Sequence, residues 1–343
     1  MIFQNLGHMR NDNKPTVEKS TSKNPSILII LIVALYFSLS TKENCANTFS
    51  NDMAYASKTN ELIRTSLDDC QSQVVWLDGI ELQTAPLICR FYESNNFEPV
   101  WTSGNELTDQ STILLELLKE SYKFGFEPSN FDIQSLEHFK RLLLKEDNAK
   151  KSVMLRVRFE FLLTNSVFSF MSHLTLGTEF SNTRDAFIAG NLIISSFPEY
   201  LNEIIFSSDI CSEILKIQPE STEYSSLQNE MKIIVSNMIT TTNSLSIPEL
   251  ESEPDRVYRL FSYVLKKEGI IKEPTDLLDH DIFTSFLIKF QEYAGIRTTG
   301  NMDNATRRVI SNIVRSRYEV IAYKLELIRH NSGYCQSLFS INN

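Results

Sequence analysis

Residues 152–176 form a run that is apolar on nearly every face of a helix, with Gly177 just past its end. A helix of this kind is usually the buried centre of a bundle and not a surface element. The chain has only 10 glycines and 10 prolines in 343 residues, and so few turn-forming residues favour long helices over a many-stranded sandwich or barrel. We therefore expect an all-α protein.

Helical periodicity continues on both sides of this run. Residues 109–124 show an apolar stripe, with Asp109 as the expected cap and Gly125 as the expected end. A further helix is predicted over 222–240, and the region 178–221 is typical of short helices and loops. We assign residues 73–240 to one helical domain.

A polar segment with two prolines follows, and we place a linker at 241–254. Compact helical patterns come after it, and we assign 255–331 to a second domain and 332–343 to a tail. The predicted helices cover 255–268 before Gly269, 281–294 with Asp281 as cap, 303–317 with Asp303 as cap, and 318–329.

The first 40 residues predict export. A polar, basic lead precedes residues 26–40, which are apolar almost throughout and carry no charge. Such a core is short for a bilayer span and is typical of a secretory signal. A cleaved signal and an uncleaved inner-membrane anchor both remain open, and residues 41–72 are expected to form a polar linker with a short helix. We expect a protein that is periplasmic, anchored facing the periplasm, or secreted.

Charge and cysteine content exclude several classes of function. The net charge of −10 argues against a nucleic-acid partner. The five cysteines show no metal-ligand spacing, and the five histidines form no metal motif, so we predict neither a metal site nor a cofactor. An exported protein could form a disulfide, for example Cys70–Cys89, although the sequence does not decide the pairing.

Four segments together form a recognisable series: FYESNNFEPVW (91–101), ILLELLKESYKFGFEPSNFD (113–132), FEFLLTNSVFSFMSHLTLG (159–177) and QPESTEYSSLQNEMKIIV (218–235). Their aromatic pair, Pro-Val-Trp and Gly-x-x-Pro loop are similar to the helical scaffold domain of bacterial periplasmic L,D-transpeptidases, which cross-link peptidoglycan. The resemblance implies that Trp101 belongs to the core, and Asn165 stands where the family often has an acidic residue.

A second block resembles the small three-helix peptidoglycan-binding-like module of the same enzymes. It comprises YVLKKEGIIK (263–272) and FTSFLIKFQEYAGIRTTGNMDNATRRVI (283–310). Gly300-Asn301 replaces the usual Asp-Gly, and KLELIRHN (324–331) only partly matches the usual Asn-Leu-Glu-Arg ending. The resemblance places a catalytic domain just after residue 331, whereas the sequence ends at Asn343. We therefore expect a relative without catalytic activity.

Other candidate catalytic residues have simpler interpretations. Transpeptidation needs a cysteine thiolate and a histidine base, and SGYCQS (332–337) offers Cys335 without a histidine before it, so we interpret it as a tail cysteine and give His330 no role. The acidic residues Glu249, Glu251 and Glu253 lie in a proline-bounded linker, where solvated charge is expected. His173 is expected to be a core histidine, and Trp76 could stack on a sugar.

Binding is better supported than chemistry. Residues 255–331 carry 13 Lys and Arg and 10 Asp and Glu, so this module is locally basic in an acidic chain. A basic module could attract the free carboxylates of peptidoglycan stems. The candidate peptidoglycan-binding residues are Gln291, Gly295, Thr299, Gly300, Arg307 and Arg308, with Arg315 and Arg317 nearby.

The leading hypothesis is therefore a non-catalytic envelope protein that binds peptidoglycan or a peptidoglycan-modifying enzyme. Two alternatives stay open. The chain could be a fragment of an interrupted L,D-transpeptidase gene, or a secreted helical interaction protein with no affinity for the cell wall.

Overall fold

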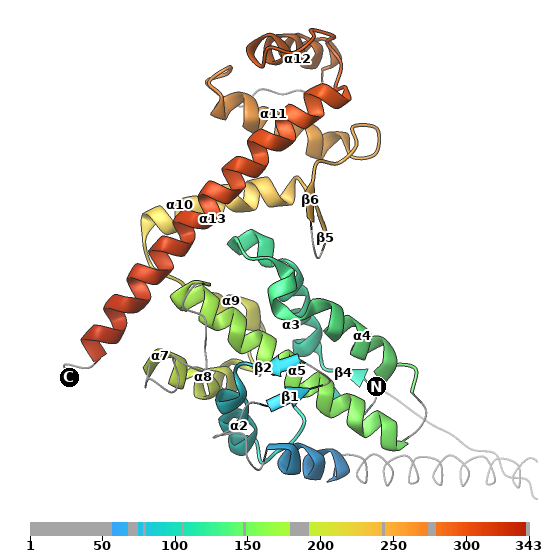
Figure 1. Ribbon diagram of the computed structural model, residues 1–343, viewed down its shortest axis with the longest axis vertical. Coiled ribbons are helices and arrows are strands. Elements are labelled where there is room, and N and C mark those ends of the chain that lie inside the picture. Colours follow the sequence, from blue (N-terminus) through green and yellow to red (C-terminus); the bar gives the residue numbers. More distant parts are fainter. Residues whose placement is uncertain are drawn as a thin grey trace, which may run out of the picture. The chain divides into compact units, whose positions relative to one another are not determined.

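The computed structural model describes residues 57–67, 75–77, 80–104, 106–146, 149–178, 192–241, 244–273 and 279–340. The chain divides into two compact units, residues 1–53 and 54–343, and every described residue belongs to the second. The predicted export segment, 26–40, lies outside the described residues. The described part consists mainly of helices with three short antiparallel strand pairs (Figure 1), which confirms the all-α prediction.

The elements before the chain's midpoint begin with a helix over residues 57–67, in the segment expected to be a linker with a short helix. The elements that follow are β1 (Val75–Leu77), β2 (Ile80–Leu82), α2 (Ala85–Ser94), β3 (Thr102–Ser103), β4 (Glu106–Leu107), α3 (Asp109–Lys119), η1 (Ser121–Phe124), η2 (Pro128–Phe131), α4 (Ile133–Leu143) and α5 (Ala149–Leu176). In the first sheet Val75 pairs with Leu82, and in the second Thr102 pairs with Leu107.

The later elements begin with short helices, as expected for the described part of the region 178–221. They are α7 (Leu192–Ser195), α8 (Phe197–Ile204), α9 (Ile210–Leu215), α10 (Thr222–Ser236), β5 (Ile239–Thr241), β6 (Ser244–Ser246), α11 (Pro254–Lys267), α12 (His280–Tyr293) and α13 (Asn304–Ser340). The strands β5 and β6 form a hairpin in which Ile239 pairs with Ser246.

Helix α5 is the buried centre of the first hydrophobic core, as its apolar pattern predicts. It contacts α2, α3, α4 and α13 (Figure 1). Because it has neighbours on several sides, it buries side chains on nearly every face, among them Phe159, Leu163 and Phe168. The helix ends before Gly177, whose φ of +83° is the left-handed conformation that glycine adopts without strain.

A buried carboxylate on α5 organises the segment that contains Trp101. Glu160 accepts hydrogen bonds from the amides of Val100 and Trp101, both at 2.9 Å, and from the hydroxyls of Tyr92 at 2.8 Å and Thr102 at 2.7 Å. The Trp101 ring is fully buried, and its Nε1 donates to another α5 residue. The prediction that Trp101 belongs to the core is confirmed.

A second hydrophobic core brings together α10, α11, α12 and α13. Its buried residues include Met231 and Ile234 from α10, Phe261 from α11, Phe290 from α12 and Val314 from α13. This core therefore includes α10, which precedes the predicted linker at 241–254. The predicted domain boundaries are not tested by this packing and stay predictions.

The last helix differs from the prediction of two helices over 303–317 and 318–329. The structure has one continuous helix, α13, over Asn304–Ser340. No glycine or proline interrupts residues 310–329, and the buried positions continue along one face at Ile310, Val314, Ile321 and Leu325. The prediction of a break was wrong because nothing in this segment stops hydrogen bonding between successive turns.

Two of the predicted helix caps are also corrected. Thr108 caps α3, and its hydroxyl accepts from the amide of Ser111, whereas Asp109 is the first helical residue. Asp279 caps α12 in place of Asp281, because its carboxylate accepts from the amides two and three positions later. The predicted cap Asp303 is confirmed by the hydrogen bond that its carboxylate accepts from the amide of Thr306 at 2.9 Å.

Candidate functional site

The loop between α12 and α13 is folded around the side chain of Gln291. This glutamine is fully buried. Its Oε1 accepts from the amides of Thr299 at 2.8 Å and Gly300 at 2.9 Å. Its Nε2 donates to the Thr306 hydroxyl at 2.8 Å and to the Asn301 carbonyl at 2.9 Å. The side chain thus stabilises the loop, because both the oxygen and the nitrogen of its amide form hydrogen bonds to it.

Asp303 fixes the other side of the same loop. Its carboxylate accepts from the Thr306 hydroxyl at 2.8 Å and from the Thr299 hydroxyl at 2.9 Å. Hydrogen bonds from the amide and hydroxyl of Thr306, and then from Thr299, lower the pKa of Asp303. Gly300 has φ +69°, and a Cβ there would lie 3.1 Å from the Thr284 methyl group. The loop geometry therefore requires glycine at position 300.

The structure brings together three of the six predicted peptidoglycan-binding residues, Gln291, Thr299 and Gly300. Gly295 ends α12 with φ +64°, and Arg308 is an exposed residue of α13. Because the Gln291 amide is enclosed, a ligand on this surface would meet exposed groups such as Arg308. Whether these six residues bind peptidoglycan is not tested by the structure, and their assignment stays a prediction.

Arg307 holds the segment before α11 against α13. Its guanidinium donates to both oxygens of Glu249, at 2.6 and 2.9 Å, and to the Ile247 carbonyl at 3.2 Å. Planar bidentate geometry of this kind is specific to arginine. Arg307 therefore acts within the fold, and Glu249 has a cation partner.

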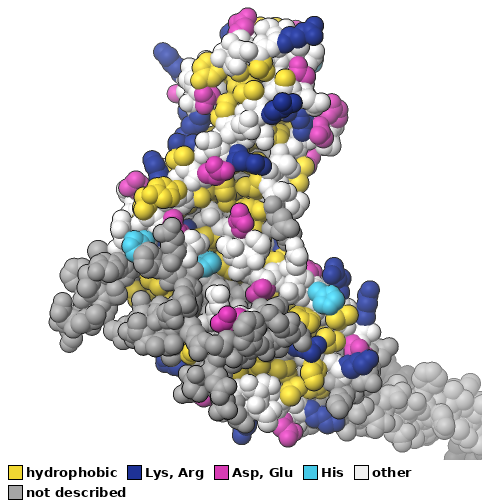
Figure 2. Space-filling view, in the orientation of Figure 1, with side chains coloured by type: hydrophobic (Ala, Val, Ile, Leu, Met, Phe, Trp, Pro, Cys, Tyr) yellow, Lys and Arg dark blue, Asp and Glu magenta, His cyan; other side chains and the backbone are white. Residues whose placement is uncertain are grey.

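The exposed cations of the module lie elsewhere. Lys289, Arg297, Arg308 and Arg315 are exposed and have no carboxylate partner among the described residues. Figure 2 shows Lys and Arg side chains interspersed with Asp and Glu over the part of the molecule that holds α11 and α12. The unpaired cations remain available to an anionic ligand, whereas Arg307 and Arg317 are already paired.

Glu230 joins α10 to α11 and α13. Its carboxylate accepts from Arg317 at 2.8 and 3.0 Å and from the Tyr263 hydroxyl at 2.7 Å, and Lys267 lies 2.8 Å away. Burial acts to raise the pKa of Glu230, but hydrogen bonds from Arg317, Lys267 and Tyr263 outweigh it and lower the pKa to about 2. This cluster stabilises the second core. Its cations, Arg317 and Lys267, are already paired with Glu230.

Arg329 on α13 is a structural residue that the sequence interpretation missed. It is fully buried. Its guanidinium donates to the Phe124 carbonyl at 2.7 Å and to the Tyr224 hydroxyl at 2.9 Å, and it lies 4.3 Å from the centre of the Phe126 ring. A signal was present, because Arg329 follows Ile321 and Leu325 at intervals of four and so lies on their buried face.

Glu326, one turn before Arg329, connects α13 to the end of α5. Its carboxylate accepts from the amide of Thr178 and, at 2.8 Å, from the Thr178 hydroxyl. A Cβ on Gly177 would lie 2.5 Å from Glu326 Oε1. Glycine at the end of α5 therefore suits both the left-handed backbone there and the position of the Glu326 carboxylate.

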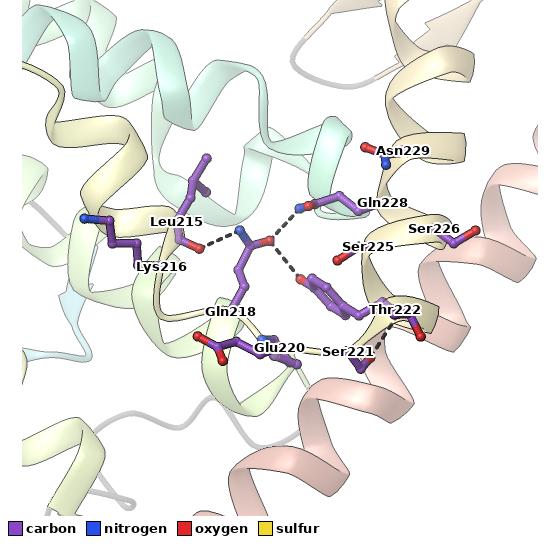
Figure 3. A pocket seen from close by; sticks show the side chains of 12 residues that line it. Leu215, Lys216, Gln218, Glu220, Ser221, Thr222, Ser225, Ser226, Gln228 and Asn229 are labelled. Atoms are coloured by element: carbon purple, nitrogen blue, oxygen red, sulfur yellow. Dashed lines mark hydrogen bonds between the residues drawn. The ribbon is translucent and has the colours of Figure 1, made fainter.

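An open hollow of about 790 Å³ lies beside the N-terminal half of α10, and we call it the α10 hollow. Figure 3 shows Gln218, from the loop before α10, and Gln228 and Ser225, from α10, extending toward one another. Gln218 Oε1 accepts from the Tyr224 hydroxyl at 3.0 Å and from Gln228 Nε2. Other residues that line it are Glu220 and Asn229.

The candidate nucleophiles in the described part lack the surroundings that activate a thiol. Cys89 is disulfide-bonded to a partner outside the described residues, and the partner is not Cys211, which is free. Burial, and then the charges of Asp209 and Glu120, raise the pKa of Cys211. A raised pKa disfavours the reactive thiolate. The side chains of Cys335 and Trp76 lie outside the described residues.

The structure also describes the two histidines named in the sequence analysis, His173 and His330. His173 is buried against the rings of Phe126 and Phe131, and burial together with the charge of Arg329 lowers its pKa to about 4. His330 lies half-buried on α13. Within the described residues, no cluster of three His, Cys, Asp or Glu side chains could hold a metal ion.

One comparison with known proteins found a match over part of the chain. Residues 86–231 match the family described as "Scaffold domain". The matched stretch begins in α2 and ends in α10, so it includes α5 and the Glu160 cluster. No curated protein and no solved structure matches the chain at a significant level. Among the described residues, no helix combines the length and apolar character needed to cross a bilayer.

Proposed function

We propose that this protein is a non-catalytic cell-envelope protein, related to the L,D-transpeptidases, that binds peptidoglycan or a peptidoglycan-modifying enzyme. The main observation in favour is that residues 86–231 match a scaffold-domain family. The same stretch contains most of the sequence that resembles the scaffold of those enzymes. The loop held by Gln291 and Asp303 belongs to the second resemblance, to a peptidoglycan-binding-like module.

Binding is favoured over chemistry by the distribution of reactive groups. The described free thiol has a raised pKa, and the linker carboxylates Glu249 and Glu253 pair with Arg307 and Arg256. By contrast, Arg297 and Arg308 are exposed and unpaired within the described residues. Peptidoglycan stems carry carboxylates, and such cations would attract them in a salt-dependent way.

Export is part of the proposal. The apolar segment 26–40 would serve as a signal or as an inner-membrane anchor. The disulfide at Cys89 supports this location, because disulfides persist in oxidising compartments such as the periplasm. Fractionation of cells into cytoplasm, membrane and periplasm would test it, and recovery in the cytoplasm would contradict it.

Sedimentation with purified sacculi tests wall binding. We expect the full chain to sediment with sacculi at low salt and to be released at high salt. The double variant Arg297→Glu and Arg308→Glu should sediment much less. Arg141→Glu, an exposed arginine on α4, is the control for a single charge reversal and should behave as the wild type.

The outcomes separate the hypotheses. If the wild-type chain stays in the supernatant with sacculi alone but is retained by whole envelopes, its partner is an envelope protein and not the wall. If neither retains it, the proposed function is wrong. Exchange of stem peptides catalysed by the purified chain would contradict the non-catalytic assignment.

A further inference from the structure

The α10 hollow holds polar groups that the fold does not use. Its volume of about 790 Å³ lies within the range of ~300–1,000 Å³ usual for ligand sites. Gln228 is nine-tenths buried, and its Nε2 is held by Gln218. Its Oε1 has no hydrogen-bond partner among the described residues. This oxygen is not enclosed by the protein, so it is open to a ligand or water in the hollow.

The Gln228 side chain is held in place before any ligand arrives. Gln218 donates through Nε2 to the Leu215 carbonyl at 2.8 Å and accepts from Gln228 and from the Tyr224 hydroxyl. Tyr224 is in turn fixed by Arg329. Because this chain of hydrogen bonds reaches the buried centre of the protein, little side-chain entropy is lost when a ligand pairs with Gln228.

The unpaired charge in the hollow is negative. Glu220 is exposed and has no cation partner in the described part of the chain. Lys216 pairs with Glu213 at 2.6 Å, and in Figure 3 it extends away from Gln218. The charge complement of the hollow is therefore a cation, and a primary amine fits a single exposed carboxylate.

The remaining groups suit the backbone of a peptide. Gln228 offers an acceptor, Asn229 offers an amide with both a donor and acceptors, and Ser225 offers a hydroxyl. An amide side chain can pair with the N–H and C=O groups of a peptide bond. No aromatic face is available for stacking on a sugar, since Tyr224 is only 2% exposed. A peptide therefore fits better than a glycan.

We propose that the α10 hollow binds a short peptide with a free primary amine, which pairs with Glu220 while its backbone pairs with Gln228 and Asn229. This rests on the proposed function, because peptidoglycan stems that end in a diamino acid supply such a peptide. The site is separate in sequence from the 255–331 module, so the two binding surfaces can be tested independently.

Calorimetric titration of the full chain with the soluble peptide N-acetyl-L-Ala-γ-D-Glu-L-Lys, whose one primary amine is that of the lysine side chain, provides the test. We expect saturable binding, weakened about tenfold by Gln228→Met, which keeps the shape and removes the acceptor. Glu220→Gln should weaken binding about threefold, as for a solvent-exposed ion pair. Acetylation of the lysine amine should weaken binding to the wild type about threefold, as Glu220→Gln does. It should not weaken binding to the Glu220→Gln variant any further.

The matched control is Glu223→Gln, the same change on an exposed residue that does not line the hollow. It should bind as the wild type does. If Gln228→Met does not fold, Asn229→Ala, at an exposed position, takes its place and should also weaken binding. Amide chemical shifts of Ser225 and Asn229 should move when the peptide is added.

Three results would overturn the inference. The peptide fails to bind, or binds equally well after acetylation, or an N-acetylglucosamine oligomer shifts Ser225 and Asn229 while the peptide does not. If sacculi retain the chain in any of these cases, the proposed function survives and only the peptide site is wrong. If the peptide binds but neither sacculi nor whole envelopes retain the chain, the peptide site stands and the proposed function is wrong.

Discussion

The guanidinium of Arg329 donates to the carbonyl oxygen of Phe124 at 2.7 Å, although 205 positions separate the two residues. Both groups lie inside the protein, so this contact ties α13 to the end of η1 beneath α10. The interaction is enclosed by the rings of Phe126 and Tyr224. These contacts explain how the charged side chain of Arg329 can be buried on a face of α13 whose other buried side chains are apolar.

Replacing Arg329 with methionine should strongly destabilise the protein. The change leaves the Phe124 carbonyl without this donor and removes the group that donates to the Tyr224 hydroxyl, which costs about 2–4 kcal/mol. Denaturant unfolding measures it. Arg308→Met, at an exposed position of the same helix, should change the free energy of unfolding by less than about 0.5 kcal/mol. Equal effects of the two variants would contradict the structural role of Arg329.

Protonation of Glu230 should weaken the second core in acid. Its pKa of about 2 lies below the ordinary value of 4.5. The stability it contributes is therefore present above pH 4.5 and lost as the pH falls toward 2. We expect about 1–2 kcal/mol, since its cation partners are partly exposed. Glu230→Gln should remove this part of the pH dependence of stability. If the variant loses stability in acid as the wild type does, Glu230 is not responsible for the loss.

His173 should act in a higher pH range. Burial and the charge of Arg329 lower its pKa from 6.5 to about 4, so the unfolded chain binds a proton that the folded chain does not. Stability should therefore fall as the pH drops from 6.5 to 4, by at most roughly 3 kcal/mol. His173→Gln should remove the fall in stability between pH 6.5 and 4. It should leave the fall caused by Glu230, at lower pH, unchanged. A slope between pH 6.5 and 4 that persists in the variant would show that another group titrates there.

Replacing Gln291 with glutamate should loosen the loop between α12 and α13. A carboxylate can still accept from the amides of Thr299 and Gly300, but it cannot donate to Thr306 or to the Asn301 carbonyl. We expect a loss of about 2–4 kcal/mol and faster hydrogen exchange at Thr299 and Gly300. Glu292→Gln, on the exposed side of α12, is the control. Unchanged exchange in Gln291→Glu would show that the loop does not depend on this side chain.

The sequence predicted those features that repeat along the chain. The buried role of α5 followed from apolar residues on nearly every face, and its end followed from Gly177. Helix continuity at 317–318 was missed, although no glycine or proline there breaks the helix. The caps at Thr108 and Asp279 were missed because neighbouring polar residues compete for the same role and only backbone geometry decides between them.

The candidate site was less predictable, since it depends on contacts between distant segments. Gln291 was expected to line a binding groove, and its burial under Thr299 and Gly300 could not be deduced from residue types. The pairing of Arg307 with Glu249 joins segments that the sequence analysis treated as separate. Gln228 was not singled out, because a glutamine on a helix gives no signal until its neighbour Gln218 is known to hold it.

Helix α13 contributes buried side chains to the second core and, through Glu326 and Arg329, also contacts the end of α5 and the η1–α10 region. We therefore expect neither half of the protein to be stable without the other. Cleavage by a protease between residues 241 and 254 should leave two pieces that remain associated, and producing 255–331 alone should yield an aggregation-prone polypeptide.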